Sequence, residues 1–249
     1  MNTSDRPLRL LLTVAHPDDE TFGLGSVLAH AAATGVEAHV ICATRGELGE
    51  PAIDIGSRPL GEVREEELRA AAGILGVAGV DVLEYRDSGT DGDAGPGSLV
   101  AADTNDVAAL IATRIDALRP DVVITADGSD GHRDHIAVRD ATLEALRTAD
   151  WRPARTYLWC LPRSLLASFA PFAEMGTPDD DITTVVDATA YIPLRWRAMR
   201  AHASQTPPYD LMSSELQHAF LRADHFVRVD PPFTGEPIEH DWIPDVAPR

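Results

Sequence analysis

The chain has 249 residues, of which 44% are hydrophobic, so it is long enough and apolar enough to bury the core of a folded domain. It carries 40 acidic residues against 21 basic ones, all arginine, and its formal net charge is −19. This charge opposes contact with nucleic-acid phosphates and with anionic membrane surfaces, so neither is expected as a partner.

The first 150 residues alternate short apolar runs with amphipathic stretches, which is typical of a parallel sheet covered by helices on both faces. Strands are predicted for residues 8–15, 36–44, 80–85 and 121–126. Helices are predicted for residues 21–34, 62–75, 104–118 and 136–148. Long glycine-containing loops at residues 45–61 and 87–103 are expected to shape the mouth of a substrate site.

The pattern becomes less regular after residue 150, although no linker, repeat or low-complexity segment marks a boundary. Short strands are predicted for residues 156–160, 183–186 and 226–229, and helices for residues 192–202 and 213–222. We therefore predict one α/β domain. A Rossmann-like core with strand order 3-2-1-4-5 would span residues 1–150, and a smaller C-terminal α+β elaboration would span residues 151–249.

The sequence shows no sign of export or of insertion into a membrane. The apolar run at residues 10–15 is too short for a secretory signal, and no stretch approaches the roughly 20 apolar residues of a membrane helix. Cys42 and Cys160 lie in apolar runs without a C-x-x-C spacing, so two buried, reduced thiols are expected. These features predict a cytoplasmic protein, and they leave open whether it forms a homo-oligomer.

Two clusters of imidazole and carboxylate groups directly follow predicted strands. The first is His-Pro-Asp-Asp-Glu at residues 16–20, and the second is Asp-Gly-Ser-Asp-Gly-His-Arg-Asp-His at residues 127–135. The first and fourth strands are neighbours in the order 3-2-1-4-5, and open parallel sheets bind ligands beyond the carboxyl ends of their strands. We therefore expect the two clusters to meet in one site.

These clusters contain the groups of a catalytic metal site. His16, Asp19 and His135 would provide two imidazoles and a carboxylate, a set that suits zinc and leaves one position for water. Asp18 would be a spare carboxylate, which is what a general base requires. His132 could act as an acid or stabilise an oxyanion, and Asp134 could orient it. The sequence alone does not decide which of the two adjacent aspartates binds the metal.

Two other interpretations use the same residues. Asp18 and Asp19 could simply cap the helix that starts near residue 21, and His132 could be a surface histidine. Two histidines and a carboxylate also bind iron(II) in non-haem oxygenases, but those enzymes usually place the set on a β-barrel, and this sequence is not all-β. The position of both clusters at adjacent strand ends favours the hydrolytic metal site.

The two clusters and four further segments together resemble the LmbE/PIG-L family of zinc N-deacetylases. The segments are VAHPDDETFGLGS at 14–26, TRGELGE at 44–50, REEELRAAAGILG at 64–76, YRDSG at 85–89, GHRDH at 131–135 and HASQ at 202–205. They occur in the family's order and cover most of the chain. The family's second motif is commonly H-P-D-H, whereas this chain has Arg133 in place of the proline, which affects loop stiffness but no proposed ligand.

The resemblance implies a role for each matching position. His16, Asp19 and His135 would bind one Zn²⁺ per chain, although other divalent metals are possible. Asp18 would be the general base, and His132 would stabilise the tetrahedral oxyanion. The resemblance also implies contacts to the sugar or its acyl group from Arg64, Glu47, His202 and Gln205.

The expected activity is the hydrolytic removal of an N-acyl group from an N-acetylglucosamine-type conjugate, and the acyl group is expected to be acetyl. This conjugate is the expected small-molecule partner. The alternative within this class is an amidase that uses the same site on a larger thiol–sugar conjugate. A non-haem iron enzyme and a non-catalytic sugar-binding protein are the alternatives from other classes. The spare carboxylate of Asp18 argues against a site that only binds sugar.

Overall fold

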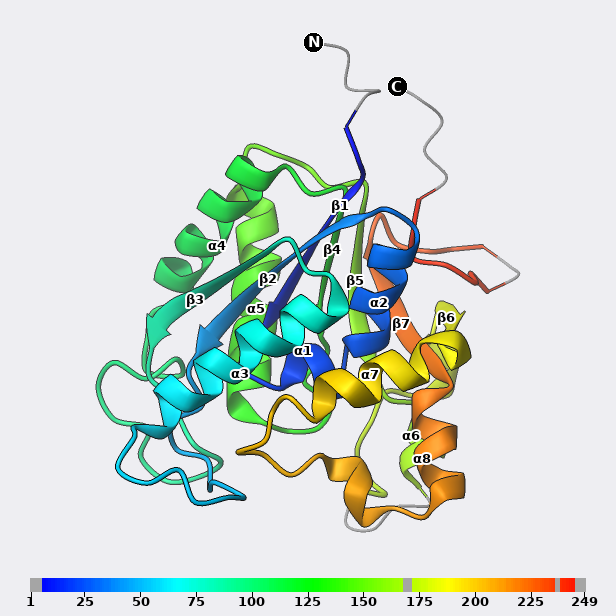
Figure 1. Ribbon diagram of the computed structural model, residues 1–249. Coiled ribbons are helices and arrows are strands. Elements are labelled where there is room, and N and C mark those ends of the chain that lie inside the picture. The colour runs from blue at the N-terminus through cyan, green and yellow to red at the C-terminus, as the bar shows by residue number, and fades with distance from the viewer. Residues whose placement is uncertain (1–5, 168–171, 236–237, 245–249) are drawn as a thin grey trace.

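A computed structural model describes residues 6–167, 172–235 and 238–244. In this part of the chain a seven-stranded sheet lies between two layers of helices (Figure 1). The strands are β1 (Arg9–Val14), β2 (Glu37–Thr44), β3 (Gly79–Tyr85), β4 (Val122–Ala126), β5 (Arg155–Cys160), β6 (Thr184–Asp187) and β7 (Ala223–Asp230). The α-helices are α1 (Asp19–Phe22), α2 (Gly25–Ala33), α3 (Leu60–Leu75), α4 (Thr104–Leu118), α5 (Arg133–Thr148), α6 (Arg163–Leu166), α7 (Ile192–Met199) and α8 (Ser214–Leu221). Short 3-10 helices are η2 (Asp179–Asp181), η3 (Thr189–Tyr191) and η4 (Pro208–Leu211).

The strands are arranged in the order β3-β2-β1-β4-β5-β7-β6. The first five pair in parallel, which confirms the predicted order 3-2-1-4-5 and the α/β fold class. β7 follows β6 in the chain but lies between β5 and β6 in the sheet, and it is antiparallel to both. The C-terminal elaboration therefore extends the same sheet.

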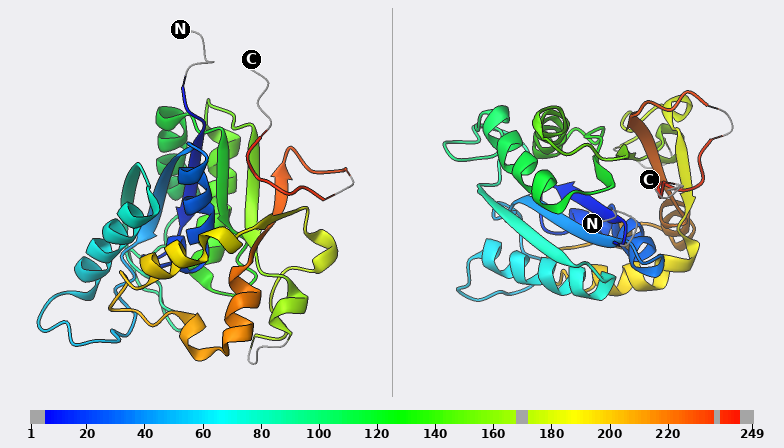
Figure 2. Two further views of the ribbon diagram at one scale, coloured as in Figure 1. Left: turned by 45° about the vertical axis from the view of Figure 1, so that its right-hand side comes forward. Right: turned by 90° about the horizontal axis from the view of Figure 1, so that it is seen from above.

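Alternate residues of the central strand β1 enter two different cores. Leu10 and Leu12 pack with residues of α2 and α3, whereas Leu11 packs with residues of α4 and α5. All three leucines are fully buried, and each contributes roughly 1.5–3 kcal/mol through the removal of its side chain from water. The view from above in Figure 2 shows α4 and α5 on one face of the sheet and α2, α3 and α7 on the other. A strand that is covered on both faces needs a continuous apolar run, and this is the pattern in the sequence.

Most predicted helices are present, but the predicted helix at residues 21–34 is interrupted. α1 ends at Phe22 and α2 begins at Gly25. The side chain of Arg195, in α7, donates hydrogen bonds to the carbonyl oxygens of Thr21, Phe22 and Gly23. These carbonyls therefore have a guanidinium partner in place of the next helical turn.

Several element boundaries differ from the prediction by a few residues. α5 begins at Arg133 and not at residue 136, because the His132 side chain caps it by accepting a hydrogen bond from the backbone N–H of Asp134. α3 begins two residues early, after Pro59, and ends before Gly76, which has φ 77°. α7 is shorter and β7 longer than predicted, and α6 was not predicted. No helix in the described ranges combines the length and apolar character needed to cross a bilayer.

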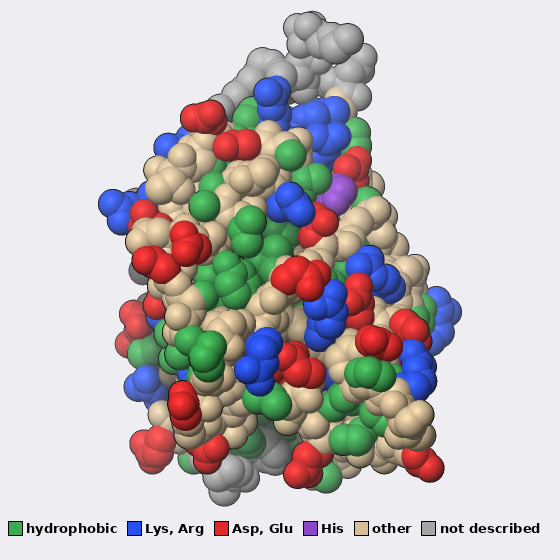
Figure 3. Space-filling view, turned by 90° about the vertical axis from the view of Figure 1, so that its left-hand side faces the viewer, with side chains coloured by type: hydrophobic (Ala, Val, Ile, Leu, Met, Phe, Trp, Pro, Cys, Tyr) green, Lys and Arg blue, Asp and Glu red, His purple; other side chains and the backbone are tan. Residues whose placement is uncertain are grey.

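The edge strand β3 carries acidic residues that pair with arginines of its neighbours. Asp81 lies 3.1 Å from Arg114 of α4, and Glu84 lies 3.0 Å from Arg45, which follows β2. Figure 3 shows this side of the molecule, where acidic and arginine side chains are interspersed around an apolar area. Charged side chains on an edge strand oppose its pairing with strands of other chains. On this face the net negative charge therefore forms no continuous acidic surface.

Candidate active site

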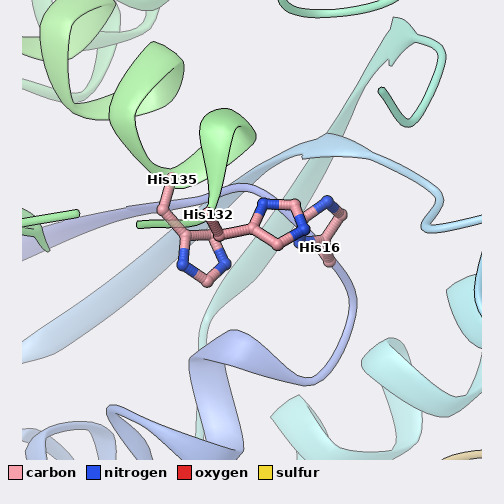
Figure 4. A group of neighbouring side chains, drawn as sticks. All are labelled: His16, His132 and His135. Carbon is pink, nitrogen blue, oxygen red and sulfur yellow. The ribbon is translucent and has the colours of Figure 1, made fainter. Parts of the chain in front are cut away.

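The two predicted clusters meet at the carboxyl ends of the parallel strands. His16 follows β1, while His132 and His135 lie at the start of α5, after β4. β1 pairs with β4, so the two segments are adjacent. Figure 4 shows the three imidazole rings gathered together, and their centroids lie 4.7–5.4 Å apart. The expected juxtaposition of the clusters is therefore present.

Carboxylates hold the buried ring of His16 from both sides. Its Nε2 lies 3.1 Å from Oδ2 of Asp134 and 3.6 Å from Oδ1 of Asp87. Its Nδ1 faces Oδ2 of Asp19 at 3.6 Å. A histidine that binds a metal usually donates its other N–H to a carboxylate or carbonyl, which fixes the ring and its tautomer. This arrangement leaves Nδ1 of His16 as the nitrogen that is free to act as a ligand.

Asp19 lies between the rings of His16 and His135. Its second oxygen, Oδ1, is 3.3 Å from Nε2 of His135. The other nitrogen of His135, Nδ1, is 2.6 Å from Oδ2 of Asp130, so this ring too is held by a carboxylate on the side away from Asp19. The structure thus brings together His16, Asp19 and His135, the residues predicted as metal ligands. In both histidines the nitrogen that faces Asp19 is opposite a supporting carboxylate.

Two groups of three described residues place one potential ligand atom each within 4.8 Å of one another, and Asp19 belongs to neither of them. They are His16, His132 and His135, and His16, Asp87 and Asp134. The second group uses the Nε2 of His16 that is already hydrogen-bonded to Asp134, so it resembles a supporting layer around the histidine. The donor set around Asp19, two imidazoles and a carboxylate, fits a divalent metal such as zinc.

The charges of these groups are strongly coupled. Burial opposes a positive charge on His135, but Asp19 and Asp130 outweigh it and raise the pKa of His135 to about 10. Burial also opposes a charge on His16, yet Asp134 and Asp19 raise the pKa of that ring. Burial would raise the pKa of Asp19, but His135 and His16 hold it well below its usual range. The surroundings therefore favour positive charge at the position that a metal ion would occupy.

His132 differs from the other two histidines. Burial lowers its pKa, and the neighbouring His16 and His135 lower it further, so this ring becomes neutral more readily. Its Nδ1 accepts the backbone N–H of Asp134 at 3.2 Å. In the neutral ring the proton must then be on Nε2, which makes Nε2 a hydrogen-bond donor. The side chain of Asp134, which was predicted to orient His132, instead contacts His16 and the backbone N–H of Ser88. Only the backbone of Asp134 orients His132.

Asp18 has a backbone φ of 126°, a conformation that is rare for residues other than glycine. Its Oδ2 accepts a hydrogen bond from Nη2 of Arg64 at 2.9 Å. Burial raises the pKa of Asp18 to about 6, and the charge of Arg64 acts in the opposite direction. The carboxylate is therefore ionised at neutral pH and is more basic than an ordinary aspartate.

Arg64 was predicted to contact the substrate, but it lies inside the protein. It is 4% exposed, and its guanidinium also donates to the carbonyl oxygens of Gly46 and Pro17, at 2.7 and 2.6 Å. A side chain at Gly46, where φ is 61°, would collide with this guanidinium. The structure therefore places Arg64 as a support for Asp18, because its hydrogen bonds are made to the protein.

The other residues predicted to contact substrate also make contacts within the protein. Oε1 of Glu47 accepts the backbone N–H of Asp87 at 3.1 Å, and so connects the two long loops. The amide nitrogen of Gln205 donates to the carbonyl oxygen of Ser204 at 2.9 Å. His202 is 1% exposed. A direct substrate contact is thus not supported for His202, whereas Glu47 and Gln205 are only partly buried.

Comparison with known proteins supports a hydrolytic role for this arrangement. The PIG-L family model, described as GlcNAc-PI de-N-acetylase, matches residues 11–146, which is more than half of the chain. The chain belongs to the PIG-L family. A PIG-L relative from Kineococcus radiotolerans is 33% identical over 98% of this chain and 84% of its own length. Another, from Nakamurella multipartita, is 36% identical over 99% of this chain and 98% of its own. Both are named 1D-myo-inositol 2-acetamido-2-deoxy-α-D-glucopyranoside deacetylase.

Solved structures show the same fold as this PIG-L chain. N,N'-diacetylchitobiose deacetylase from Pyrococcus horikoshii has a TM-score of 0.68 and 19% identity, over 88% of this chain and 83% of that one. A 4-carboxy-2-hydroxymuconate hydratase from Pseudomonas putida has a TM-score of 0.66 and 21% identity, over 92% and 99%. Because a hydratase shares the fold, the fold alone does not decide the reaction. Function must therefore be inferred from the side chains of the site.

One buried ion pair in this PIG-L chain was not predicted. Nε2 of His202 lies 2.7 Å from Oε1 of Glu20, and both side chains are fully buried. The other oxygen of Glu20, Oε2, accepts the backbone N–H of Asp18 at 2.9 Å. Burial opposes a charge on His202, but Glu20 outweighs it and raises the pKa of the ring. The pair thus stabilises the backbone of Asp18 through the hydrogen bond from its N–H to Glu20. The HASQ segment was the one sequence signal for it, and the partner of His202 was not evident there.

Proposed function

We propose that the chain is a metal-dependent N-deacetylase that hydrolyses the amide of an N-acetylglucosamine-type conjugate. The observation that carries this proposal is the position of the Asp19 carboxylate between Nδ1 of His16 and Nε2 of His135, next to the basic carboxylate of Asp18. The names of the relatives support the substrate class, an amino-sugar that is linked to a polyol.

His16, Asp19 and His135 would hold the metal, and their donor chemistry favours zinc. When bound, the ion would polarise the amide carbonyl and lower the pKa of a nearby water. The supporting carboxylates Asp134 and Asp130 keep the two imidazole rings oriented toward Asp19.

Asp18 would act as the general base. It accepts a proton from the attacking water while the water oxygen bonds to the carbonyl carbon of the amide. Its raised pKa, about 6, makes the carboxylate a better proton acceptor, and Arg64 and Glu20 fix its position. As the C–N bond breaks, the protonated Asp18 returns this proton to the nitrogen, so that a neutral amine leaves. The products are acetate and a free sugar amine.

His132 would stabilise the negative charge that develops on the carbonyl oxygen. With Nδ1 engaged by the backbone of Asp134, the Nε2–H of His132 is available as a donor even when the ring is neutral. This role therefore does not require a charged imidazole beside His16 and His135, whose proximity disfavours one.

The test is an assay of amine release together with metal analysis. The purified protein would be incubated with N-acetylglucosamine, N,N'-diacetylchitobiose and the N-acetylglucosaminyl inositol glycoside, and primary amine and acetate would be measured. We expect about one divalent ion per chain, loss of activity on chelation, and recovery on addition of Zn²⁺. Metal-loaded protein that releases amine from none of these amides would overturn the proposal.

A further inference from the structure

A pocket of about 180 Å³ opens directly beside Asp19 and His135. Its surface is mainly apolar and comes from the junction of α1 and α2, the loop after β4, the end of β5 and the C-terminal elaboration. The apolar lining comprises Phe22, Trp159, Leu161, Leu166 and Tyr209. The pocket therefore lies on the β5 side of the candidate metal ligands.

Apart from Asp19 and His135, the polar side chains that line this pocket are Asp127, Ser129 and Asp130, and they are already engaged. Asp127 accepts hydrogen bonds from Ser129 and Thr177. Asp130 binds His135 and the backbone N–H of His132. Sugar hydroxyls placed against the apolar wall would lose their hydrogen bonds to water without replacement, which is costly. The pocket is thus suited to hydrocarbon and poorly suited to a polyol.

The polar surroundings lie on the opposite side of the site. The loops after β2 and β3 contribute Glu47 and Asp87 there, and Arg133 donates to the carbonyl oxygens of Gly89 and Asp91. An amide has two substituents, and a carbonyl carbon next to Asp19 must direct one of them toward each side. The polar loop side suits the polyol amine better than the apolar pocket does, which leaves the pocket for the acyl substituent.

We propose that this pocket is an acyl-chain subsite, and that the enzyme hydrolyses N-acyl amino-sugars whose acyl chain is longer than acetyl. This inference rests on the proposed function. The methyl group of an acetyl substituent would fill little of the space between Leu161, Leu166 and Trp159. Each added methylene would bury further apolar surface, and is expected to raise kcat/KM by about two- to fourfold until the pocket is full.

The experiment compares N-acetyl-, N-butyryl-, N-hexanoyl- and N-octanoylglucosamine on the metal-loaded enzyme, with glucosamine release as the readout. The matched variants are Leu161→Trp, which fills the pocket, and Leu165→Trp. Both leucines pack against the same small core cluster, but Leu165 lines a different cavity. We expect Leu161→Trp to lower kcat/KM for the longer chains by roughly tenfold or more while N-acetyl hydrolysis continues. Leu165→Trp should retain the chain-length preference, and Tm would be measured for both variants.

The outcomes separate this inference from the proposed function. If N-acetylglucosamine is hydrolysed and the longer amides are not, the acyl subsite is wrong and the deacetylase stands. If rates rise instead with the alkyl length of N-acetylglucosaminide glycosides, the pocket binds the aglycone, and the acyl assignment is overturned. If no amide of any chain length is hydrolysed, both proposals fail together. A chain-length preference that Leu161→Trp abolishes supports the subsite.

Discussion

Asp18 and Asp19 are adjacent in the chain, yet their carboxylates have different surroundings. Asp19 is approached by two imidazole nitrogens, and its pKa is held low. Burial raises the pKa of Asp18 to about 6, and Arg64 is the main cationic group that opposes this shift. A carboxylate between two imidazoles suits a metal ligand, whereas a more basic carboxylate beside them suits a proton acceptor. The two carboxylates accordingly face different partners, Arg64 for Asp18 and the two imidazoles for Asp19.

We expect Asp18→Asn and Asp19→Asn to fail in different ways. Asp18→Asn keeps all three proposed ligands, so it should retain metal while kcat falls by roughly 10²–10⁴ through the loss of proton transfer. Asp19→Asn should lose metal and activity together, because an amide is a poorer ligand than a carboxylate. His16→Ala should do the same, because it removes one of the three ligands. Metal stoichiometry and kcat would be measured for each variant. Metal lost from Asp18→Asn and retained by Asp19→Asn would reverse the two roles.

The Glu20–His202 pair leads to a second prediction at this scale. His202→Ala would leave the Glu20 carboxylate buried without its charged partner, which should cost about 3–5 kcal/mol of stability. Because Glu20 would no longer hold the backbone N–H of Asp18 firmly, kcat should fall with little change in KM or metal content. His202→Gln should restore part of kcat, because the Gln amide can still donate to Glu20.

Gln205→Ala is the control in the same segment, since the side-chain amide of Gln205 donates to Ser204 and not to the Glu20–His202 pair. Steady-state kinetics and urea unfolding would be measured for these variants. A rise in KM at unchanged kcat in His202→Ala would instead support the substrate contact that the family resemblance implied.

At the scale of elements, α7 determines the shape of the segment that follows Asp18 and Asp19. Arg195 of α7 is 1% exposed and donates to three carbonyls at the junction of α1 and α2, and also to the hydroxyl of Tyr209 in η4. Its guanidinium lies 3.8 Å from buried Asp224 at the start of β7. The C-terminal elaboration thereby fixes where α1 ends, and α1 starts at Asp19.

Arg195→Ala should therefore be much more harmful than Arg197→Ala in the same helix. Loss of Arg195 leaves several carbonyls and Asp224 without their cationic partner, at a cost of about 3–5 kcal/mol. Arg197 is exposed, and its removal should change stability by no more than about 0.5 kcal/mol. Urea unfolding would give both values. Equal stability of the two variants would show that the junction of α1 and α2 does not depend on α7.

The sequence predicted those elements whose signals lie within a short stretch of the chain. The apolar run of β1 and the strand–helix alternation predicted the parallel order, and this order placed His16 beside His132 and His135. The interruption near Gly23 could not be predicted, because Arg195, which causes it, is distant in the sequence. The partner of His202 was missed for the same reason. The family resemblance implied a substrate contact for Arg64, and a sequence alone shows neither the burial of this side chain nor its hydrogen bonds to the protein.

At the scale of the whole molecule, the two halves of the chain share one core. The cluster on the α2 and α3 face contains Leu12 and Leu28 from the first half, together with Tyr157, Phe226 and Trp242 from the second. β5 pairs with β4 across the position where the Rossmann-like core was predicted to end. We infer that residues 1–249 fold as a single domain, and that the division at residue 150 describes topology and not an independent folding unit.

A chain of residues 1–150 should therefore not fold, although it contains every proposed metal ligand. It lacks β5, so one edge of β4 would be exposed with unpaired backbone groups. It also lacks Arg195 and His202, which hold α1 and Asp18, and Tyr157, Phe226 and Trp242, which complete the core.

The full chain should unfold in urea in one cooperative transition that is the same by fluorescence and by circular dichroism. The shorter chain should show no such transition, even with Zn²⁺ added. A cooperative transition and metal binding by residues 1–150 would demonstrate an independent core domain, and would show that the second half serves only to complete the pocket.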